Sequence, residues 1–149
     1  MASDTELSAT PMPMPIPPGL ARRLAAIAYD SLLLTAVLIV ATAILLPFTG
    51  GEAIHPGSGW YATYLFIVSF AYFGWFWTHG GQTLGMRSWR LRLVGDGSNG
   101  ATWGQALVRF AAAAVSWLVF GVGFLWMLVD SERLTWHDRI SATRLVGLS

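Results

Sequence analysis

The feature that most constrains this chain is an apolar stretch long enough to cross a membrane, with an acidic residue near its start. Residues 31–49 read SLLLTAVLIVATAILLPFT and contain no charged side chain. About 20 apolar residues cover the ~30 Å hydrocarbon core of a bilayer, so a helix over residues 21–46 would cross it with Asp30 inside. A carboxylate there costs roughly 2.5–3.5 kcal/mol on insertion scales. Asp30 therefore indicates either a partner group or a function.

Arg23 is the first candidate partner, but it cannot reach Asp30 unaided. It precedes Asp30 by seven residues, close to two helical turns, so both side chains share one helix face. They are about 10 Å apart along the axis at ~1.5 Å per residue. Unless both side chains lean together, another segment of the chain has to supply a bridging group.

Composition agrees with a membrane protein and excludes several classes. Of 149 residues, 54% are hydrophobic and 11% are charged, against roughly 25% charged in soluble domains. The net charge of +1 argues against a nucleic-acid partner, and the absence of cysteine excludes disulfides and thiol chemistry. The sequence contains no nucleophile elbow, phosphate loop, HExxH motif or paired catalytic carboxylates. We therefore expect no enzymatic activity, no cofactor and no metal site.

The first nineteen residues differ from the rest. They contain prolines at positions 11, 13, 15, 17 and 18, which favour polyproline II over helix. We expect residues 1–19 to be a disordered cytoplasmic tail, and residues 20–149 to form one membrane domain. The alternative for the tail is a docking motif for a proline-binding partner.

Two further apolar stretches follow the first. Residues 60–78 read WYATYLFIVSFAYFGWFWT, with aromatic residues at both ends, as expected at the two membrane interfaces. Residues 110–129 contain no charge, and Thr102 with Gln105 matches a helix capping box ahead of them. The sequence predicts an all-helical membrane protein with two full spans, over residues 21–46 and 60–78, and a third apolar element over 103–129.

Arginine placement predicts the orientation of the chain. Arg22 and Arg23 precede the first stretch, while the loop over residues 48–59 contains no Lys or Arg. The connection after the second stretch carries Arg87, Arg90, Arg92 and Arg109. By the positive-inside rule, we expect the N-terminus and this connection to be cytoplasmic.

Three arginines that follow the third stretch conflict with a third crossing. They are Arg133, Arg139 and Arg144, and three full crossings would place them outside. One resolution is that the early helices set the topology and the third stretch crosses. The other is a break near Gly121–Gly123 that makes this stretch re-entrant, because buried non-helical backbone is tolerated at membrane depth. The re-entrant alternative places every arginine on the cytoplasmic side. The sequence leaves both alternatives open.

A short β pairing is predicted beside the membrane. In residues 89–93 the apolar Trp, Leu and Leu alternate with arginines, a period of two that is typical of a strand. The turn Gly95-Asp96-Gly97 follows. Residues 144–146, Arg-Leu-Val, repeat the sequence of residues 92–94. We expect these two segments to pair, which requires both to lie on the cytoplasmic face.

Three motifs in order resemble the RDD family of small bacterial membrane proteins. RRLAAIAYD contains Arg23 and Asp30, GGQTLGMRSWRLRLVGDG resembles the glycine-rich turn and strand of the family, and WHDRISATRLV places Asp138 as the second aspartate. The resemblance covers about residues 20–147, although Leu84 and Met86 depart from the commoner pattern. It implies a multi-pass protein of the bacterial inner membrane. For this family, transport of an unidentified ligand has been suggested and no reaction is established.

We expect Arg23, Asp30 and Asp138 to converge near the cytoplasmic boundary, with Arg109 or Arg139 completing the charge balance. Such a cluster suits transport of an ion or small solute, and the alternative is a non-transporting assembly or interaction subunit. The alternative is a purely structural role, in which Asp30 pairs with an arginine to hold packed segments together and Asp138 caps a helix or turn. His79 and His137 are either proton-relay groups or ordinary hydrogen-bonding residues.

Besides the lipid bilayer, we expect a homo-oligomer or a partner membrane subunit. Three apolar elements cannot enclose a polar path while shielding it from lipid on all sides. The alanine run with Ser116, residues 111–116, offers a small-residue surface for such a contact.

Overall fold

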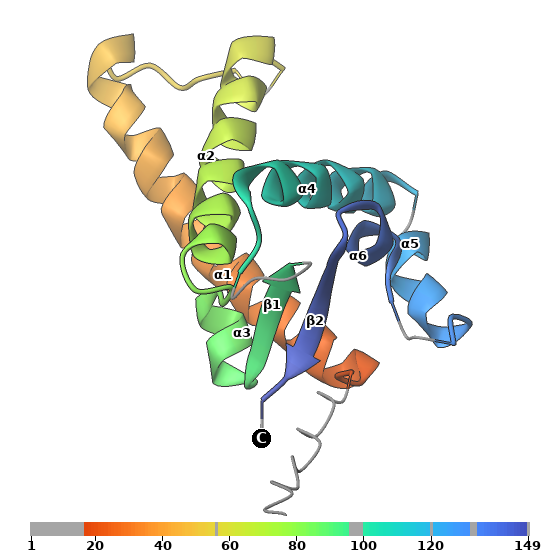
Figure 1. Ribbon diagram of the computed structural model, residues 1–149. Coiled ribbons are helices and arrows are strands. Elements are labelled where there is room, and N and C mark those ends of the chain that lie inside the picture. Colours follow the sequence, from red (N-terminus) through yellow and green to blue (C-terminus); the bar gives the residue numbers. More distant parts are fainter. Residues whose placement is uncertain (1–16, 56, 96–99, 120, 132–133, 149) are drawn as a thin grey trace, which may run out of the picture.

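The structure is a computed structural model that describes residues 17–55, 57–95, 100–119, 121–131 and 134–148. Its two longest elements are α1 (Leu20–Leu45), continued by the 3-10 helix η1 (Leu46–Thr49), and α2 (Gly59–Thr78). Figure 1 shows α1 and α2 as an antiparallel pair whose connecting loop lies far from the C-terminus. Most of the tail predicted over residues 1–19 lies outside the described residues.

One described stretch is long and apolar enough to cross a membrane. It covers residues 20–49, and only 6% of its most apolar segment is buried within the chain. At ~1.5 Å per residue, the 26 residues of α1 extend about 39 Å, more than a ~30 Å hydrocarbon core. Leu32, Ile39 and Ile44 are exposed along it, as expected of lipid-facing side chains. The aromatic-rich α2 does not meet the same measure of length and apolarity, so a second span is not confirmed.

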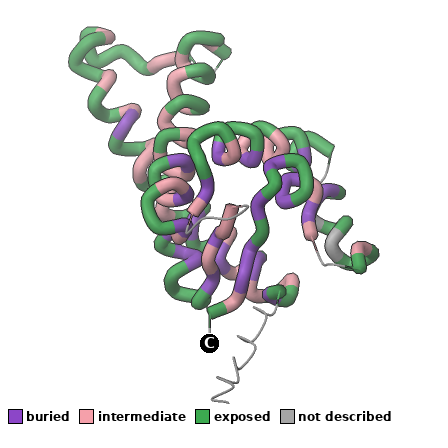
Figure 2. Tube along the Cα trace, viewed as in Figure 1, coloured by how far each residue is buried: buried purple, intermediate pink, exposed green. Residues whose placement is uncertain are grey.

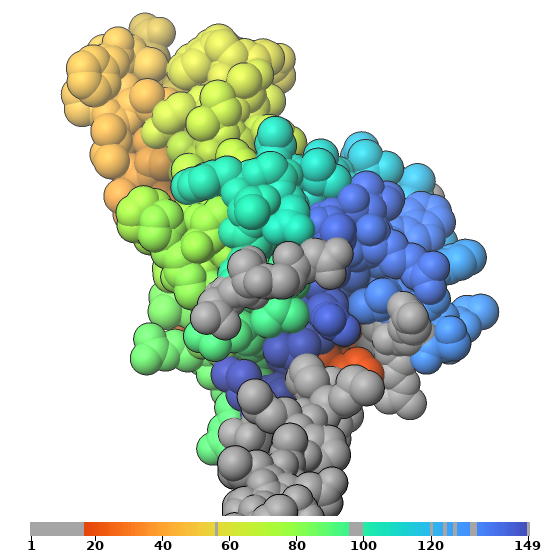
Figure 3. Space-filling view, viewed as in Figure 1, coloured from red at the N-terminus to blue at the C-terminus, as the bar shows by residue number. Residues whose placement is uncertain are grey.

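Polar side chains join α1 and α2 near their connecting loop. The hydroxyls of Thr42 and Tyr61 are 2.8 Å apart, and the Tyr64 hydroxyl donates to the Ala41 carbonyl at 3.1 Å. These bonds satisfy hydroxyls on the facing sides of the two helices. In the space-filling view of Figure 3, the loop end of the pair projects clear of the rest of the molecule.

The predicted β pairing is confirmed. Strands β1 (Leu91–Gly95) and β2 (Thr143–Gly147) form a two-stranded antiparallel sheet with Leu93 opposite Leu145. The short helix α3 (Leu84–Ser88) leads into β1. Leu91 and Leu93 are fully buried, whereas Trp89, which precedes β1, is 43% exposed.

The third apolar stretch is interrupted rather than one continuous helix. Helix α4 (Trp103–Leu118) begins with the predicted capping box of Thr102 and Gln105. Gly121 then takes a left-handed conformation with φ 72°, which glycine adopts without steric cost. Three short elements follow, α5 (Val122–Leu125), η2 (Trp126–Leu128) and α6 (Trp136–Ile140). The helix therefore ends close to the break predicted near Gly121–Gly123.

The core lies where the sheet meets the N-terminal half of α1, the end of α2 and the start of α4. Its buried members come from all of these elements: Ala26, Trp77, Met86, Leu91, Leu93, Ala101, Ala106 and Leu145. Figure 2 shows that buried residues gather around the sheet, while the loop end of α1 and α2 is exposed. We call the region formed by the sheet, α3, α4, α6 and the adjoining ends of α1 and α2 the packed base. The fold thus consists of this base and of the apolar helix pair that projects from it.

Candidate functional site

Two arginines meet at one carboxylate in the packed base. Arg23 Nη1 lies 2.8 Å from Asp138 Oδ2, and Arg109 Nη1 lies 2.5 Å from Asp138 Oδ1. The three side chains come from α1, α4 and α6, and each is at most 5% exposed. We call Arg23, Arg109 and Asp138 the charge cluster. It joins segments 115 residues apart in the sequence.

Local sequence explains how the Asp138 carboxylate is held. Thr135 is the N-cap of α6, and Asp138 occupies the third helical position, so the two form a capping box. Asp138 Oδ2 accepts from the Thr135 backbone N–H at 3.1 Å while also binding Arg23. Asp138 therefore serves both as a helix cap and as an ion-pair partner.

Arg109 is oriented by two further contacts besides the carboxylate. Its Nη1 donates to Thr143 Oγ1 at 2.9 Å, and its guanidinium carbon lies 5.4 Å from the centroid of the Trp77 ring. Thr143 is in turn 2.6 Å from the Ser141 hydroxyl. A cation over an aromatic face is attracted by the ring quadrupole, so the position of this guanidinium is well defined.

The carboxyl group of Asp138 is ionised and the imidazole of His137 is neutral at neutral pH. Burial on its own raises the pKa of Asp138, but the guanidiniums of Arg109 and Arg23 outweigh burial and hold the pKa well below its ordinary range. Burial and the nearby Arg109 lower the pKa of His137 to about 3, so its imidazole is neutral. Two guanidiniums consequently face a single carboxylate.

Asp30 is held by a different part of the chain. Its Oδ2 accepts from the Thr83 hydroxyl, and its Oδ1 accepts from the Gly85 backbone N–H at 2.8 Å. Thr83 also caps α3 by accepting from the Met86 N–H at 3.1 Å. Among the residues that the structure describes, no arginine forms an ion pair with Asp30.

Gly85 is required by the close approach of α3 to α1. A Cβ atom at this position would lie 2.4 Å from the Ala26 carbonyl oxygen and 2.7 Å from Asp30 Cγ. Both contacts are far shorter than van der Waals separation. The glycine therefore allows its own N–H to reach the Asp30 carboxylate.

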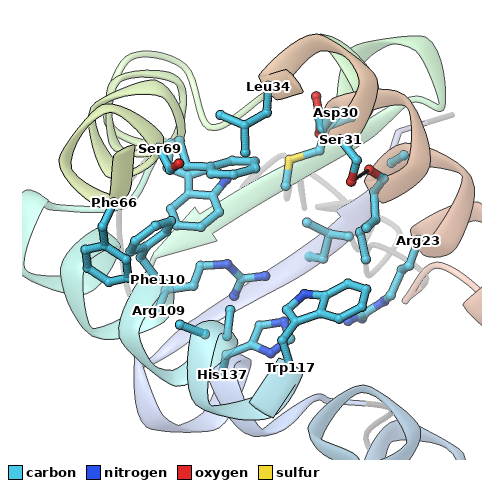
Figure 4. Close-up of a pocket in the computed structure, with 18 residues that line it drawn as sticks. Arg23, Asp30, Ser31, Leu34, Phe66, Ser69, Arg109, Phe110, Trp117 and His137 are labelled. Atoms are coloured by element: carbon cyan, nitrogen blue, oxygen red, sulfur yellow. Dashed lines mark hydrogen bonds between the residues drawn. The ribbon is translucent and has the colours of Figure 1, made fainter. Parts of the chain in front are cut away.

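A cavity of about 390 Å³ lies between α1, α2, α4 and α6. Figure 4 shows the guanidinium of Arg109 pointing into it, with Phe66 and Phe110 on one side and Trp117 and His137 below. Arg23 and Asp30 also line it. The cavity is therefore largely apolar, and the two arginines of the charge cluster form part of its wall.

The structure brings together some of the predicted site residues and separates others. Arg23, Arg109 and Asp138 converge, whereas Asp30 lines the same cavity but binds α3. Arg139 lies outside the charge cluster and pairs with Asp130 at 2.6 Å, with its side chain 51% exposed. Of the two alternatives for completing the charge balance, the structure thus has Arg109.

The two histidines also differ. His137 lines the cavity, while His79 stacks on Trp75 with ring centroids 4.0 Å apart and bonds Thr78. Within the described part of the chain, no three His, Cys, Asp or Glu side chains are grouped so as to hold a metal ion. These positions identify no metal centre in that part.

Sequence reasoning missed the residues that bind Asp30. Thr83 and Gly85 lie in the glycine-rich segment quoted for the resemblance, yet nothing in their spacing relates them to a residue more than 50 positions earlier. The available signal was local, since Thr83 precedes a short helical segment and is of an N-cap type. The hydroxyl of such an N-cap residue can also donate a hydrogen bond, but tertiary packing determines which group accepts it.

The structure thus joins one helix that is long and apolar enough to cross a membrane to a base that contains buried ion pairs. Residues 17–142 match the RDD family, which is a family of membrane proteins. This match covers most of the chain, so the protein belongs to the RDD family. Comparison with curated proteins and with solved structures found no match.

Proposed function

We propose that the protein crosses the inner membrane of a bacterium twice, through α1 and α2, with its N-terminus in the cytoplasm. The 20 residues of α2 extend about 30 Å, which is enough for a bilayer core. In Figure 1, α3, the sheet and α6 all lie at the end opposite the α1–α2 loop. Two strands of one sheet occupy one face of a membrane, which supports placing both connections with the arginines on the cytoplasmic side.

The α4–η2 region fits a re-entrant element better than a third span. Helix α4 has 16 residues, fewer than the ~17–25 that a transmembrane helix usually needs. A chain that turns at Gly121 and returns would keep β2 on the same face as β1. A reporter fused to the C-terminus tests this topology, and activity of an exported reporter would contradict it.

The function that the geometry supports best is binding and movement of an ion or small solute through the cavity. One observation carries this proposal: Asp30 lines the cavity with a carboxylate that neutral donors hold and that no described arginine neutralises. Asp138, by contrast, is fully engaged by two arginines. We therefore assign the charge cluster to structure and Asp30 to a transported proton or ion.

Flux into liposomes tests this proposal. Purified protein is reconstituted with a pH-sensitive or sodium-sensitive dye inside, and Asp30→Asn is compared with Glu52→Gln. The second change removes a carboxylate from the exposed loop between α1 and α2. We expect Asp30→Asn to abolish flux and Glu52→Gln to retain it. Equal flux in the two variants would refute a role for Asp30.

A transporter of this size needs further subunits, and we propose a homo-oligomer or a partner membrane subunit. Ala113 and Ala114 line the cavity within one chain, and a Cβ on Gly123 would lie 2.4 Å from Ser116 Oγ. Only the exposed Ala111 and Val115 side of this small-residue segment is left for another subunit. Full flux from a monomer in mild detergent and liposomes would contradict this proposal.

The full neutralisation of Asp138 favours one alternative, a non-transporting assembly or interaction subunit without enzymatic activity. Under this alternative the charge cluster only stabilises the fold, and the tail binds a partner. Deleting residues 1–18 would then abolish binding of that partner. Flux that survives the deletion supports the transporter instead.

A further inference from the structure

We propose that the cavity binds an amphiphile with one anionic oxygen headgroup, a carboxylate or a phosphate, at the free edge of Arg109. This inference rests on the proposed function, because it names the class of solute for the same cavity. Three features of the cavity support it: the apolar wall, the unused donors of Arg109 and the positive charge of the Arg109 guanidinium.

The apolar wall fits a hydrocarbon body. Leu34 from α1, Phe66 and Phe73 from α2, and Phe110 from α4 all line the cavity. Its volume of about 390 Å³ falls within the ~300–1,000 Å³ of typical small-molecule pockets. Water gains few hydrogen bonds from such walls, so an apolar molecule is the favoured occupant.

Arg109 provides the headgroup site. Its side chain is 5% exposed and points into the cavity. Only Nη1 is used for Asp138 and Thr143; within the described chain its Nε and Nη2 make no hydrogen bond. Nε and Nη2 form one edge of a guanidinium, the edge that binds a carboxylate or phosphate through two parallel bonds.

Charge selects an anion over a cation at this position. The charge cluster contains two guanidiniums and one carboxylate, and His137 beside it is neutral because its pKa is lowered to about 3. The Asp30 carboxylate is bound to Thr83 and Gly85 on α3. A cationic headgroup at the free edge of Arg109 would be repelled by the guanidinium at short range, whereas an anion would accept hydrogen bonds from Nε and Nη2.

The test uses three probes with the same tail and different headgroups. The full chain is placed in nanodiscs of zwitterionic lipid and titrated with dodecanoate, methyl dodecanoate and dodecylamine. Bound molecules per chain are counted by native mass spectrometry, with empty nanodiscs correcting for partition into lipid. We expect saturable binding of dodecanoate at least about tenfold tighter than that of the ester or the amine, which corresponds to about 1.4 kcal/mol. Equal binding of all three, tighter binding of the amine or no saturable binding would overturn the inference.

Two matched variants locate the binding site. Ala113→Trp inserts a large ring into the cavity wall, while Ala62→Trp places the same ring at an exposed position of α2 that does not line the cavity. We expect Ala113→Trp to weaken dodecanoate binding at least about tenfold and Ala62→Trp to leave it unchanged, with both proteins eluting and melting alike. Equal affinity in the two variants would show that the cavity is not the site and would overturn the inference.

A third variant tests the free edge of the guanidinium. Arg109→Lys keeps the positive charge but removes the two parallel donors. We expect it to weaken dodecanoate binding about tenfold without changing the weak binding of the methyl ester. An unchanged preference for the carboxylate over the ester would overturn the assignment of Arg109.

Two sources could supply this headgroup chemistry, a membrane phospholipid and a free fatty acid. The mass of the molecule that copurifies with the chain distinguishes them, and either one supports the inference. Failure of the inference is separable from failure of the proposed function. If flux depends on Asp30 but binding shows no preference for the carboxylate, the inference is wrong and the proposed function stands. Selective binding without flux supports the inference and leaves a lipid-binding membrane protein in place of a transporter.

Discussion

Removing the charge of Asp138 should destabilise the protein by about 3 kcal/mol. Asp138→Asn leaves the guanidiniums of Arg23 and Arg109 buried without their carboxylate. Breaking a buried ion pair by removing one partner costs about 3–5 kcal/mol. The asparagine keeps one acceptor oxygen and can still accept from the Thr135 N–H, so we expect the lower end of this range. That is a large share of the ~5–15 kcal/mol by which proteins are stable.

The matched control is Asp130→Asn. Asp130 also pairs with an arginine, but only its own side chain is buried (7% exposed) while that of Arg139 is 51% exposed; because water screens the exposed partner, we expect this pair to contribute about 0–1 kcal/mol. Denaturant unfolding of both variants in the same detergent, followed by tryptophan fluorescence, gives the two free energies of unfolding. A cost for Asp138→Asn no greater than that for Asp130→Asn would refute the conclusion that the charge cluster holds the base together.

Three further predictions concern single positions. Gly85→Ala forces a Cβ to within 2.4 Å of a carbonyl oxygen and should cost at least about 1–3 kcal/mol, whereas Gly104→Ala, with nothing within 4 Å, should be neutral or stabilising by thermal unfolding. Thr83→Val removes the hydroxyl that donates to Asp30, and we expect a loss of about 1–3 kcal/mol that a Thr83→Ser variant largely avoids. Because the folded-state pKa of His137 is about 3 and its ordinary value is 6.5, the unfolded chain binds a proton that the folded chain excludes. Stability is then full above pH 6.5 and falls by about 1.4 kcal/mol per unit below it; His137→Gln should flatten this loss, and a pH profile identical to the parent protein would contradict it.

Short-range patterns predicted the helices and the sheet well. The apolar stretches predicted as spans over 21–46 and 60–78 located α1 and α2 to within a residue or two at each end, because a helix in an apolar solvent must satisfy its own backbone. The alternation of arginine and leucine in 89–93 predicted β1, and the repeat at 144–146 identified its partner strand. These signals depend only on neighbouring residues.

The candidate site was predictable only in part. The chemistry of buried charge required partners for Asp30 and Asp138, yet sequence alone could not distinguish Arg109 from Arg139, since both lie at plausible depth. Tertiary packing determines which arginine binds Asp138, because α4 crosses the base of the molecule and brings Arg109 to α6. For Asp30 the partner is a backbone N–H of Gly85, and backbone groups have no sequence signature at all.

The charge cluster also sets an order of events during synthesis. Arg23 and Asp138 are 115 residues apart, and at ~5–20 residues per second a ribosome takes about 6–23 s to make the segment between them. Helix α1 is therefore complete, and available for membrane insertion, long before the carboxylate that binds Arg23 exists. The base can close only after α6 has emerged, so the last segment of the domain completes a structure whose first segment has already been placed. A chain that stalls before Asp138 would therefore contain a complete α1 and an unfinished base in which Arg23 lacks the Asp138 carboxylate.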